Sequence, residues 1–253
     1  MIRILAIAVV ACAAPAAVRA PPPSAPPVAA IGDTFVVDSK LLGERRVVNV
    51  YVPPDYATSH ERYPVLYMPD GGMKEDFPHV VGSVDVSIKD AVIRPLIVVG
   101  IENTDRKRDL VTSSARFRAF LRDELRPLVA ARYRTTAETA IVGESLAGLF
   151  VVETYLVEPA LFDSYIAADP SVWWNDAALV HEANVDLVDH APKPLYIATS
   201  SDADLDAMDM LATALRIAGL PWTYEPMPAE HHNSIFAIAA LRGVRFAFAK
   251  PEP

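Results

Sequence analysis

From residue 35 onward, short apolar runs alternate with longer segments of helical periodicity. The short runs predict strands at 35–38, 46–52, 64–68, 95–101, 139–142, 164–168, 194–199 and 222–227. The two earliest runs alternate apolar and polar positions and suit an antiparallel edge. Several later runs are almost entirely apolar, which is typical of strands covered on both faces.

The clearest helical pattern covers residues 114–132, where the apolar positions fall on one face and Pro127 predicts a kink. Helices are also predicted over 205–218, which ends before Gly219, and over 235–250. Strands that alternate with helices predict an α/β fold with a mostly parallel central sheet and helices on both faces. We expect one such domain over residues 31–253, with its ligand site at the carboxyl ends of the strands.

The first 30 residues have a different character. An early positive charge, an apolar run over residues 4–11 and small residues afterwards predict an export signal. Residues 9–12 also resemble the lipobox of bacterial lipoproteins, in which Cys12 would carry the lipid; the alternative is an ordinary signal that is cleaved later, for instance after Ala30. The proline-rich stretch 21–27 predicts a tether. We therefore expect an exported protein, periplasmic or anchored to the cell envelope, with no other membrane contact.

Composition narrows the classes of function. The chain has 23 Lys and Arg residues against 32 Asp and Glu residues, a net charge of -9, which argues against nucleic acids and other anionic polymers as partners. Cys12 is the only cysteine, so neither an intramolecular disulfide nor a cysteine-rich zinc site can form. We expect no metal and no organic cofactor.

The sharpest chemical signal lies in the segment TAIVGESLAGLF, residues 139–150. An apolar strand passes through Gly143 and Ser145 directly into a helix, which is the setting of a nucleophile elbow: glycine permits the sharp turn and the serine hydroxyl projects from its apex. The N–H of Leu146 opens the helix without a partner inside it, so it can stabilise an oxyanion. Ala147 stands where the motif usually has glycine. The alternative is that Ser145 only caps the helix.

A catalytic serine needs a base and an acid, which in this fold follow it in the order acid, histidine. His231 and His232 lie between a predicted strand and the last helix, and either could serve as the base. The acid is expected just past the preceding strand. Asp202 is the first candidate there, followed by Asp204, with Asp206 also open; the alternative role of these residues is to cap the next helix.

A second oxyanion donor should come from the loop after the third strand. That loop contains Gly71 and Gly72, which let backbone amides approach a ligand closely. Gly72 is the donor that we favour, although the pair taken alone could form a plain turn.

Five ordered segments, residues 64–72, 103–110, 143–150, 169–174 and 232–234, together resemble one family of α/β-hydrolases. This esterase family includes esterase D, feruloyl esterases, the siderophore esterases that open enterobactin, and the mycolyl-transferases. The resemblance covers about residues 34–249. It implies a serine esterase with Ser145 as nucleophile and with His232 instead of His231 as base, because His232 occupies the His-Asn-Ser position. Pro69 departs from the aliphatic residue that usually precedes Asp-Gly.

The resemblance also assigns the surroundings of the nucleophile. It implies that Gly72 provides the oxyanion amide and that Arg106, Trp173 and Trp174 form part of the pocket rim. For the two tryptophans the alternative is core packing, because aromatic side chains bury large areas wherever they lie. Some siderophore esterases resemble Ser-His dyads, so a strong acid could be dispensable.

We therefore expect an exported carboxylic-ester hydrolase that acts through an acyl-enzyme on a small-molecule ester, a siderophore or a similar acyl ester. One alternative is an acyltransferase of the mycolyl-transferase type. The other is a non-catalytic hydrolase-fold lipoprotein that binds a ligand. The sequence leaves the oligomeric state open.

Overall fold

The computed structural model describes residues 31–183 and 192–250, so the predicted export signal, the lipobox at Cys12 and the tether lie outside the described residues. The described residues form one sheet of eight strands in the order β1-β2-β4-β3-β5-β6-β7-β8. The strands are β1 (Asp33–Ser39), β2 (Glu44–Tyr51), β3 (Tyr63–Met68), β4 (Ile97–Ile101), β5 (Thr135–Glu144), β6 (Ser164–Ala168), β7 (Leu195–Thr199) and β8 (Thr223–Pro226).

Strand direction follows the prediction. β1 pairs antiparallel with β2 and β2 with β4, whereas all pairs from β4 through β3 and on to β8 are parallel. The predicted α/β fold with a mostly parallel sheet is confirmed. Because the strands after β2 run the same way, the loops that follow β3, β5, β6 and β7 all emerge at one edge of the sheet.

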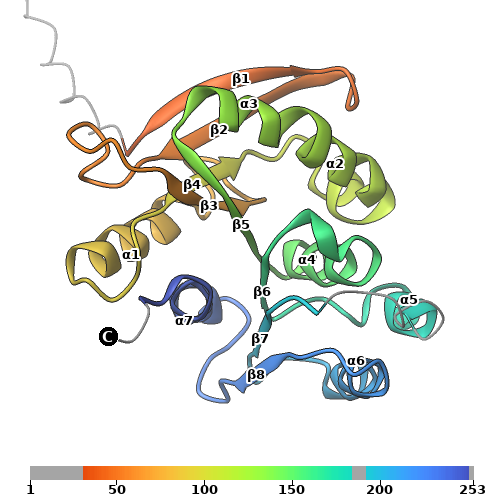
Figure 1. The fold of residues 1–253 in the computed structure, drawn as a ribbon. Coiled ribbons are helices and arrows are strands. Elements are labelled where there is room, and N and C mark those ends of the chain that lie inside the picture. Colours follow the sequence, from red (N-terminus) through yellow and green to blue (C-terminus); the bar gives the residue numbers. More distant parts are fainter. Residues whose placement is uncertain (1–30, 184–191, 251–253) are drawn as a thin grey trace, which may run out of the picture. The chain divides into compact units, whose positions relative to one another are not determined.

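Helices cover both faces of this sheet (Figure 1). α1 (Phe77–Lys89) and α7 (Ile235–Phe248) pack on one face, where they share a buried cluster with alternate strand residues such as Leu66 and Met68. The other face carries a larger cluster that includes Val65 and Tyr67. Burial on both faces explains why these strands are apolar at successive positions. The remaining helices, on that second face, are α2 (Ser114–Phe120), α3 (Arg126–Arg132), α4 (Leu146–Val157), α5 (Trp174–Ala183) and α6 (Leu205–Ile217).

The helix predicted over 114–132 forms as three consecutive pieces. A π-helical segment, η2 (Leu121–Leu125), separates α2 from α3, and Pro127 lies in the first turn of α3. Proline has no N–H to donate to the preceding turn, and the wider turns of η2 stand where that hydrogen bond would be lost. The predicted interruption is therefore present, directly before Pro127.

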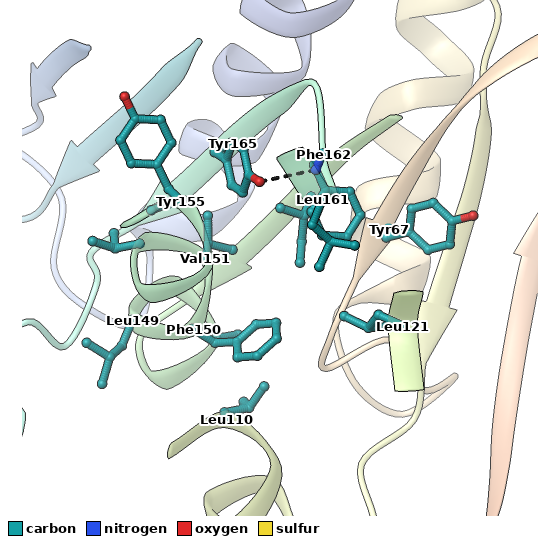
Figure 2. Packing of buried hydrophobic residues seen from close by; sticks show 14 of the residues in the cluster. Tyr67, Leu110, Leu121, Leu149, Phe150, Val151, Tyr155, Leu161, Phe162 and Tyr165 are labelled. Atoms are coloured by element: carbon teal, nitrogen blue, oxygen red, sulfur yellow. Dashed lines mark hydrogen bonds between the residues drawn. The ribbon is translucent and has the colours of Figure 1, made fainter. Parts of the chain in front are cut away.

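α4 is apolar on almost all sides, and nine of its 12 residues are buried. It packs against β5 and β6 and also contacts two short helical segments, η1 (Arg108–Thr112) and η3 (Pro159–Leu161). Figure 2 shows Phe150, Val151 and Tyr155 of α4 within the same core cluster as Tyr165 of β6, whose hydroxyl accepts a hydrogen bond from the N–H of Phe162 at 3.1 Å. Most of the helix that follows Ser145 is thus buried in the core.

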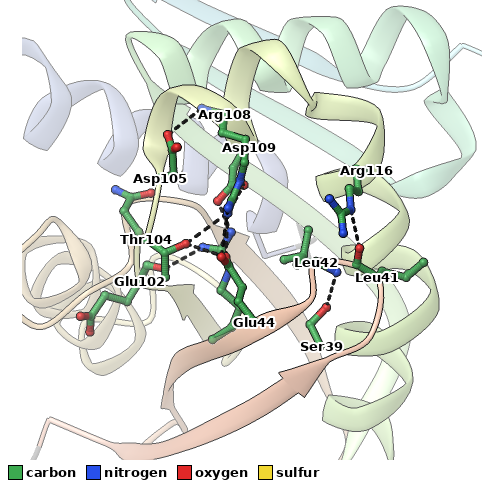
Figure 3. A network of polar contacts seen from close by, with 12 residues as sticks. Ser39, Leu41, Leu42, Glu44, Glu102, Thr104, Asp105, Arg108, Asp109 and Arg116 are labelled. Carbon is green, nitrogen blue, oxygen red and sulfur yellow. Dashed lines mark hydrogen bonds and ion pairs between the residues drawn. The ribbon is translucent and has the colours of Figure 1, made fainter.

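A buried polar network fixes the loop after β4 (Figure 3). Arg46 of β2 is only 1% exposed; it pairs with Asp109 and donates to the carbonyl of Glu102 at 3.2 Å. Arg108 donates to both carboxylate oxygens of Glu44, at 2.7 and 3.0 Å. These contacts hold residues 102–109 against the β1–β2 hairpin and so position the segment that carries Arg106.

Among the described residues, no helix is long and apolar enough to cross a membrane.

Candidate active site

Ser145 stands at a sharp turn between β5 and α4. Its backbone adopts φ 58° and ψ -119°, a region that residues other than glycine rarely occupy, and α4 begins at the next residue. A Cβ at residue 143 would lie 2.6 Å from the backbone of Ala147, so the turn requires glycine there. This is the strained strand-turn-helix geometry that exposes a nucleophile at the edge of a parallel sheet. In the described part of the chain, the N–H of Leu146 has no hydrogen-bond acceptor.

A buried carboxylate faces the imidazole of His232. Asp169 directly follows β6, its side chain is 4% exposed, and its Oδ2 lies 2.6 Å from His232 Nδ1. Ser200 holds this carboxylate in place: its backbone N–H donates to Oδ1 at 2.9 Å and its hydroxyl to Oδ2 at 2.7 Å. The carboxylate is therefore fixed by two further donors and is aimed at the ring nitrogen.

Asp202, the acid favoured by the sequence, lies in a different place. Its side chain is 50% exposed, and it accepts a hydrogen bond from the backbone N–H of His232 at 2.9 Å. Its other oxygen lies 3.3 Å from Nδ1 of His231. The His232 N–H and the His231 ring hold the pKa of Asp202 below its ordinary value. Asp204 caps α6 by accepting the Ala207 N–H at 3.0 Å, and Asp206 is exposed.

The geometry thus favours Asp169 over Asp202 as the partner of the His232 ring. Sequence reasoning looked for the acid only after the strand that precedes the histidine, which is β7, and so it missed a residue after β6. One signal was available: Asp169 follows an apolar strand directly and precedes proline, and it lies within one of the segments that carried the family resemblance.

Sequence reasoning also missed Ser171. Its hydroxyl lies 3.3 Å from the hydroxyl of Ser145, and its backbone N–H donates to the Ser145 carbonyl at 3.0 Å. Within the described ranges, this contact and not one to His232 is the hydrogen bond of the Ser145 hydroxyl. Catalytic hydrogen bonds are often long in ligand-free enzymes and tighten when substrate binds.

The loop after β3 lies beside the elbow. Arg106 donates to both oxygens of Asp70, at 2.7 and 2.8 Å, and reaches the carbonyl of Glu144 at 3.4 Å. The guanidinium therefore ties this loop to the residue before Ser145. Gly72 follows in the same loop, and its N–H donates to Oε2 of Glu75 at 2.7 Å.

The two tryptophans have different surroundings. Trp173 is 49% exposed, so it is not a core residue, whereas Trp174 packs partly buried against the larger core cluster. Trp174 and Leu149 of α4 also line a cavity of about 480 Å³, where the ammonium of Lys107 lies 4.7 Å from the centre of the Trp174 ring. Leu149 lies in the first turn after the nucleophile, where its N–H donates to the Ser145 carbonyl at 2.8 Å.

The site is strongly acidic. Burial raises the pKa of Glu144 to about 7; His232 opposes this shift, while Asp76, Asp169 and Asp70 add to it. One of the carboxylate oxygens of Glu144 is buried and has no hydrogen-bond partner among the described residues. Despite this density of carboxylates, the described residues hold no group of three or more side chains arranged to bind a metal ion.

The parallel sheet, the strained serine turn and the Asp169–His232 pair at one sheet edge define an α/β-hydrolase. Residues 39–231 match the family described as "Putative esterase", and the chain belongs to that family. The family resemblance found in the sequence is confirmed.

Several relatives act on siderophores by name. The ferri-bacillibactin esterase BesA of Bacillus subtilis is 23% identical over 261 residues, which cover 83% of this chain and 88% of BesA. The siderophore triacetylfusarinine C esterase of Aspergillus fumigatus is 39% identical over 69 residues, 26% of this chain and 24% of that relative. The match thus spans about a quarter of the length of this fungal esterase. An IroE-like serine hydrolase from Shewanella oneidensis superimposes with a TM-score of 0.77 at 27% identity, covering 85% of this chain and 79% of that structure.

Proposed function

We propose that this protein is a serine esterase that hydrolyses carboxylic esters through an acyl-enzyme. The observation that carries the proposal is the strained Ser145 turn, at the same sheet edge as a buried carboxylate that lies 2.6 Å from the His232 ring. Membership of the esterase family supports the same chemistry.

In the proposed mechanism, the Ser145 hydroxyl attacks the ester carbonyl while Nε2 of His232 takes its proton. The N–H groups of Gly72 and Leu146 hold the oxyanion of the tetrahedral intermediate. His232 then returns the proton to the leaving alcohol. In the second half, His232 takes a proton from water, the hydroxide releases the acid from Ser145, and the serine recovers its proton.

Asp169 takes the role that the sequence gave to Asp202. A carboxylate at Nδ1 keeps the ring proton on that nitrogen and leaves Nε2 free to accept the proton of the serine. It also stabilises the imidazolium that forms during each half-reaction. Asp202 instead holds the backbone at His232, which supports the position of the ring without touching it.

For the substrate we propose a small-molecule ester of the siderophore type. The names of the relatives support this class, and the cavity beside α4 offers room for a substituent of several heavy atoms. Trp174 and Lys107 would contact that substituent, and we assign the exposed Trp173, whose ring lies 5.9 Å from that of Trp174, to the pocket rim. Arg106 is paired with Asp70, so its main role in this proposal is to hold the loop after β3 in place. Its place at the pocket rim is a second role. Export to the periplasm or cell envelope remains part of the proposal.

Hydrolysis of p-nitrophenyl acetate and butyrate, with intact mass after a fluorophosphonate probe, tests the assignment. We expect wild type to turn over and to gain one adduct on Ser145, and Ser145→Ala and His232→Ala to lose about three orders of magnitude or more. His231→Ala is the matched control, because it removes the neighbouring imidazole and should stay within a few-fold of wild type.

A folded wild type that neither labels nor turns over would refute the nucleophile and favour the binding lipoprotein. Product analysis with added alcohol separates the acyltransferase alternative, since an acyltransferase forms a new ester where a hydrolase releases acid.

A further inference from the structure

We propose that Glu75 is a specificity-determining residue of this site, whose carboxylate occupies the Gly72 N–H in the free protein and must be displaced by the ester oxygen before that amide can act. The inference rests on the proposed function, because it takes Gly72 as an oxyanion donor.

Three contacts place the Glu75 carboxylate at the oxyanion amide. Oε2 accepts the Gly72 N–H at 2.7 Å, and Oε1 lies 3.4 Å from the N–H of Asn103. The backbone N–H of Glu75 also donates to the Gly72 carbonyl at 3.0 Å, so the turn folds the side chain back onto the amide three residues earlier. A Cβ at residue 72 would lie 2.9 Å from Oε2, which shows how closely the carboxylate covers this glycine.

An amide N–H has one hydrogen to give. Hydrogen bonds to an ionised acceptor are about twice as strong as those between neutral groups, so the neutral carbonyl of an ester is a weaker partner for Gly72 than the Glu75 carboxylate is. Only the oxyanion that forms after attack matches that carboxylate in charge. In the resting protein, therefore, the Leu146 N–H is open to substrate while the Gly72 N–H is occupied.

The electrostatic surroundings favour release of Glu75. In the described part of the chain no cation pairs with it, because the nearby guanidinium of Arg106 is engaged by Asp70. Other carboxylates crowd the same loop: burial and the neighbouring Asp70 and Glu75 raise the pKa of Asp76. Displacing the Glu75 side chain toward water thus breaks no ion pair and relieves repulsion, and it removes a negative charge from beside the developing oxyanion.

Specificity follows from which substrate contacts supply the free energy that displaces the Glu75 carboxylate. A small ester has only its carbonyl to compete with Glu75, whereas a larger ester can gain binding free energy elsewhere, for example in the cavity at Trp174, and use it to displace the carboxylate. Glu75 therefore discriminates against small, weakly held esters and leaves larger ones less affected.

The test compares Glu75→Ala and Glu75→Gln with wild type. We expect Glu75→Ala to raise kcat/KM for p-nitrophenyl acetate, and the rate of fluorophosphonate labelling, by about ten-fold, the equivalent of one charge-assisted hydrogen bond. Glu75→Gln keeps an acceptor without the charge and should fall between. Boronic acids, which form a tetrahedral adduct on an active serine, should bind Glu75→Ala more tightly by a similar factor. Glu61→Ala removes an exposed carboxylate outside the site and serves as the control.

The outcomes separate the two proposals. If wild type labels on Ser145 but the Glu75 variants are unchanged or slower, the serine esterase assignment stands and the inference is overturned: a slower variant would mean that the carboxylate orients the Gly72 amide. If no protein labels, both proposals fail. Thermal melting of each variant, with Glu75→Gln as the conservative change, confirms that the compared proteins are folded.

Discussion

Replacing Asp169 by asparagine tests the arrangement of the site most directly, because the structure dictates how the new side chain must sit. The backbone N–H of Ser200 can only donate, and it faces Oδ1 at 2.9 Å. The amide oxygen of Asn must therefore take that position, which turns its NH₂ group toward Nδ1 of His232. The imidazole then has to accept at Nδ1, so its proton moves to Nε2, the nitrogen that should take the proton of Ser145.

The size of the effect follows from this change of tautomer. A wrong tautomer and the loss of the charge at 2.6 Å together should lower kcat by about 10³ to 10⁴-fold, or about 4–5.5 kcal/mol of transition-state stabilisation, as in serine proteases with the equivalent change. Asp202→Asn is the matched control. Its amide oxygen can still accept the His232 N–H in an exposed position, so we expect a loss of less than about ten-fold.

Steady-state hydrolysis of p-nitrophenyl butyrate, with circular dichroism to confirm folding, measures both variants. Equal losses in the two, or a larger loss in Asp202→Asn, would refute the assignment of Asp169. Activity near wild type in both would show that Ser145 and His232 act as a dyad.

Two further predictions concern stability. Urea unfolding should show that Glu144→Gln stabilises the protein by about 2 kcal/mol at pH 8 and has no effect near pH 4, because the pKa of Glu144 is about 7 in the folded state against an ordinary value of 4.5. The contribution of this group to stability is thus present below pH 4.5 and is lost as pH rises through 7, and solvent screening of a half-buried group reduces the full value. An equal change in stability at both pH values would contradict this cause. Asp109→Ala should lower the free energy of unfolding by about 3 kcal/mol, because it leaves the charge of Arg46 buried without its main partner. The control is Asp38→Ala, which breaks an exposed ion pair with Arg45 and should lower it by less than about 1 kcal/mol. Similar losses in the two variants would show that Glu44 alone compensates Arg46.

The sheet was predictable from sequence because its strands are buried on both faces and therefore stand out as apolar runs, such as 95–101 and 164–168. The serine turn was predictable for a local reason as well: the strand, Gly143, Ser145 and the helix are consecutive, and the backbone conformation follows from neighbouring residues. Strand bounds shifted by up to four residues, as for β5, because chain pairing and not composition decides where a ladder ends.

The partner of the His232 ring was not predictable in the same way. Asp169 and Asp202 both follow parallel strands and emerge at one sheet edge, so the order of residues along the chain does not distinguish them. Only the three-dimensional structure distinguishes them. Asp169 is buried and held by Ser200, whereas Asp202 accepts a hydrogen bond from the backbone N–H of His232. The contact between Glu75 and Gly72 depends in the same way on the direction of one side chain.

The burial of α4 has a consequence for how this protein fails on heating. Nine of its 12 residues are buried, so we expect the helix to stay packed until the core opens and most of its amide hydrogens to exchange only then. The turn that holds Ser145 is anchored to the first residues of this helix. Activity and the folded core should therefore be lost in the same thermal transition. We expect no inactive intermediate in which the Ser145 turn is displaced while the sheet stays folded.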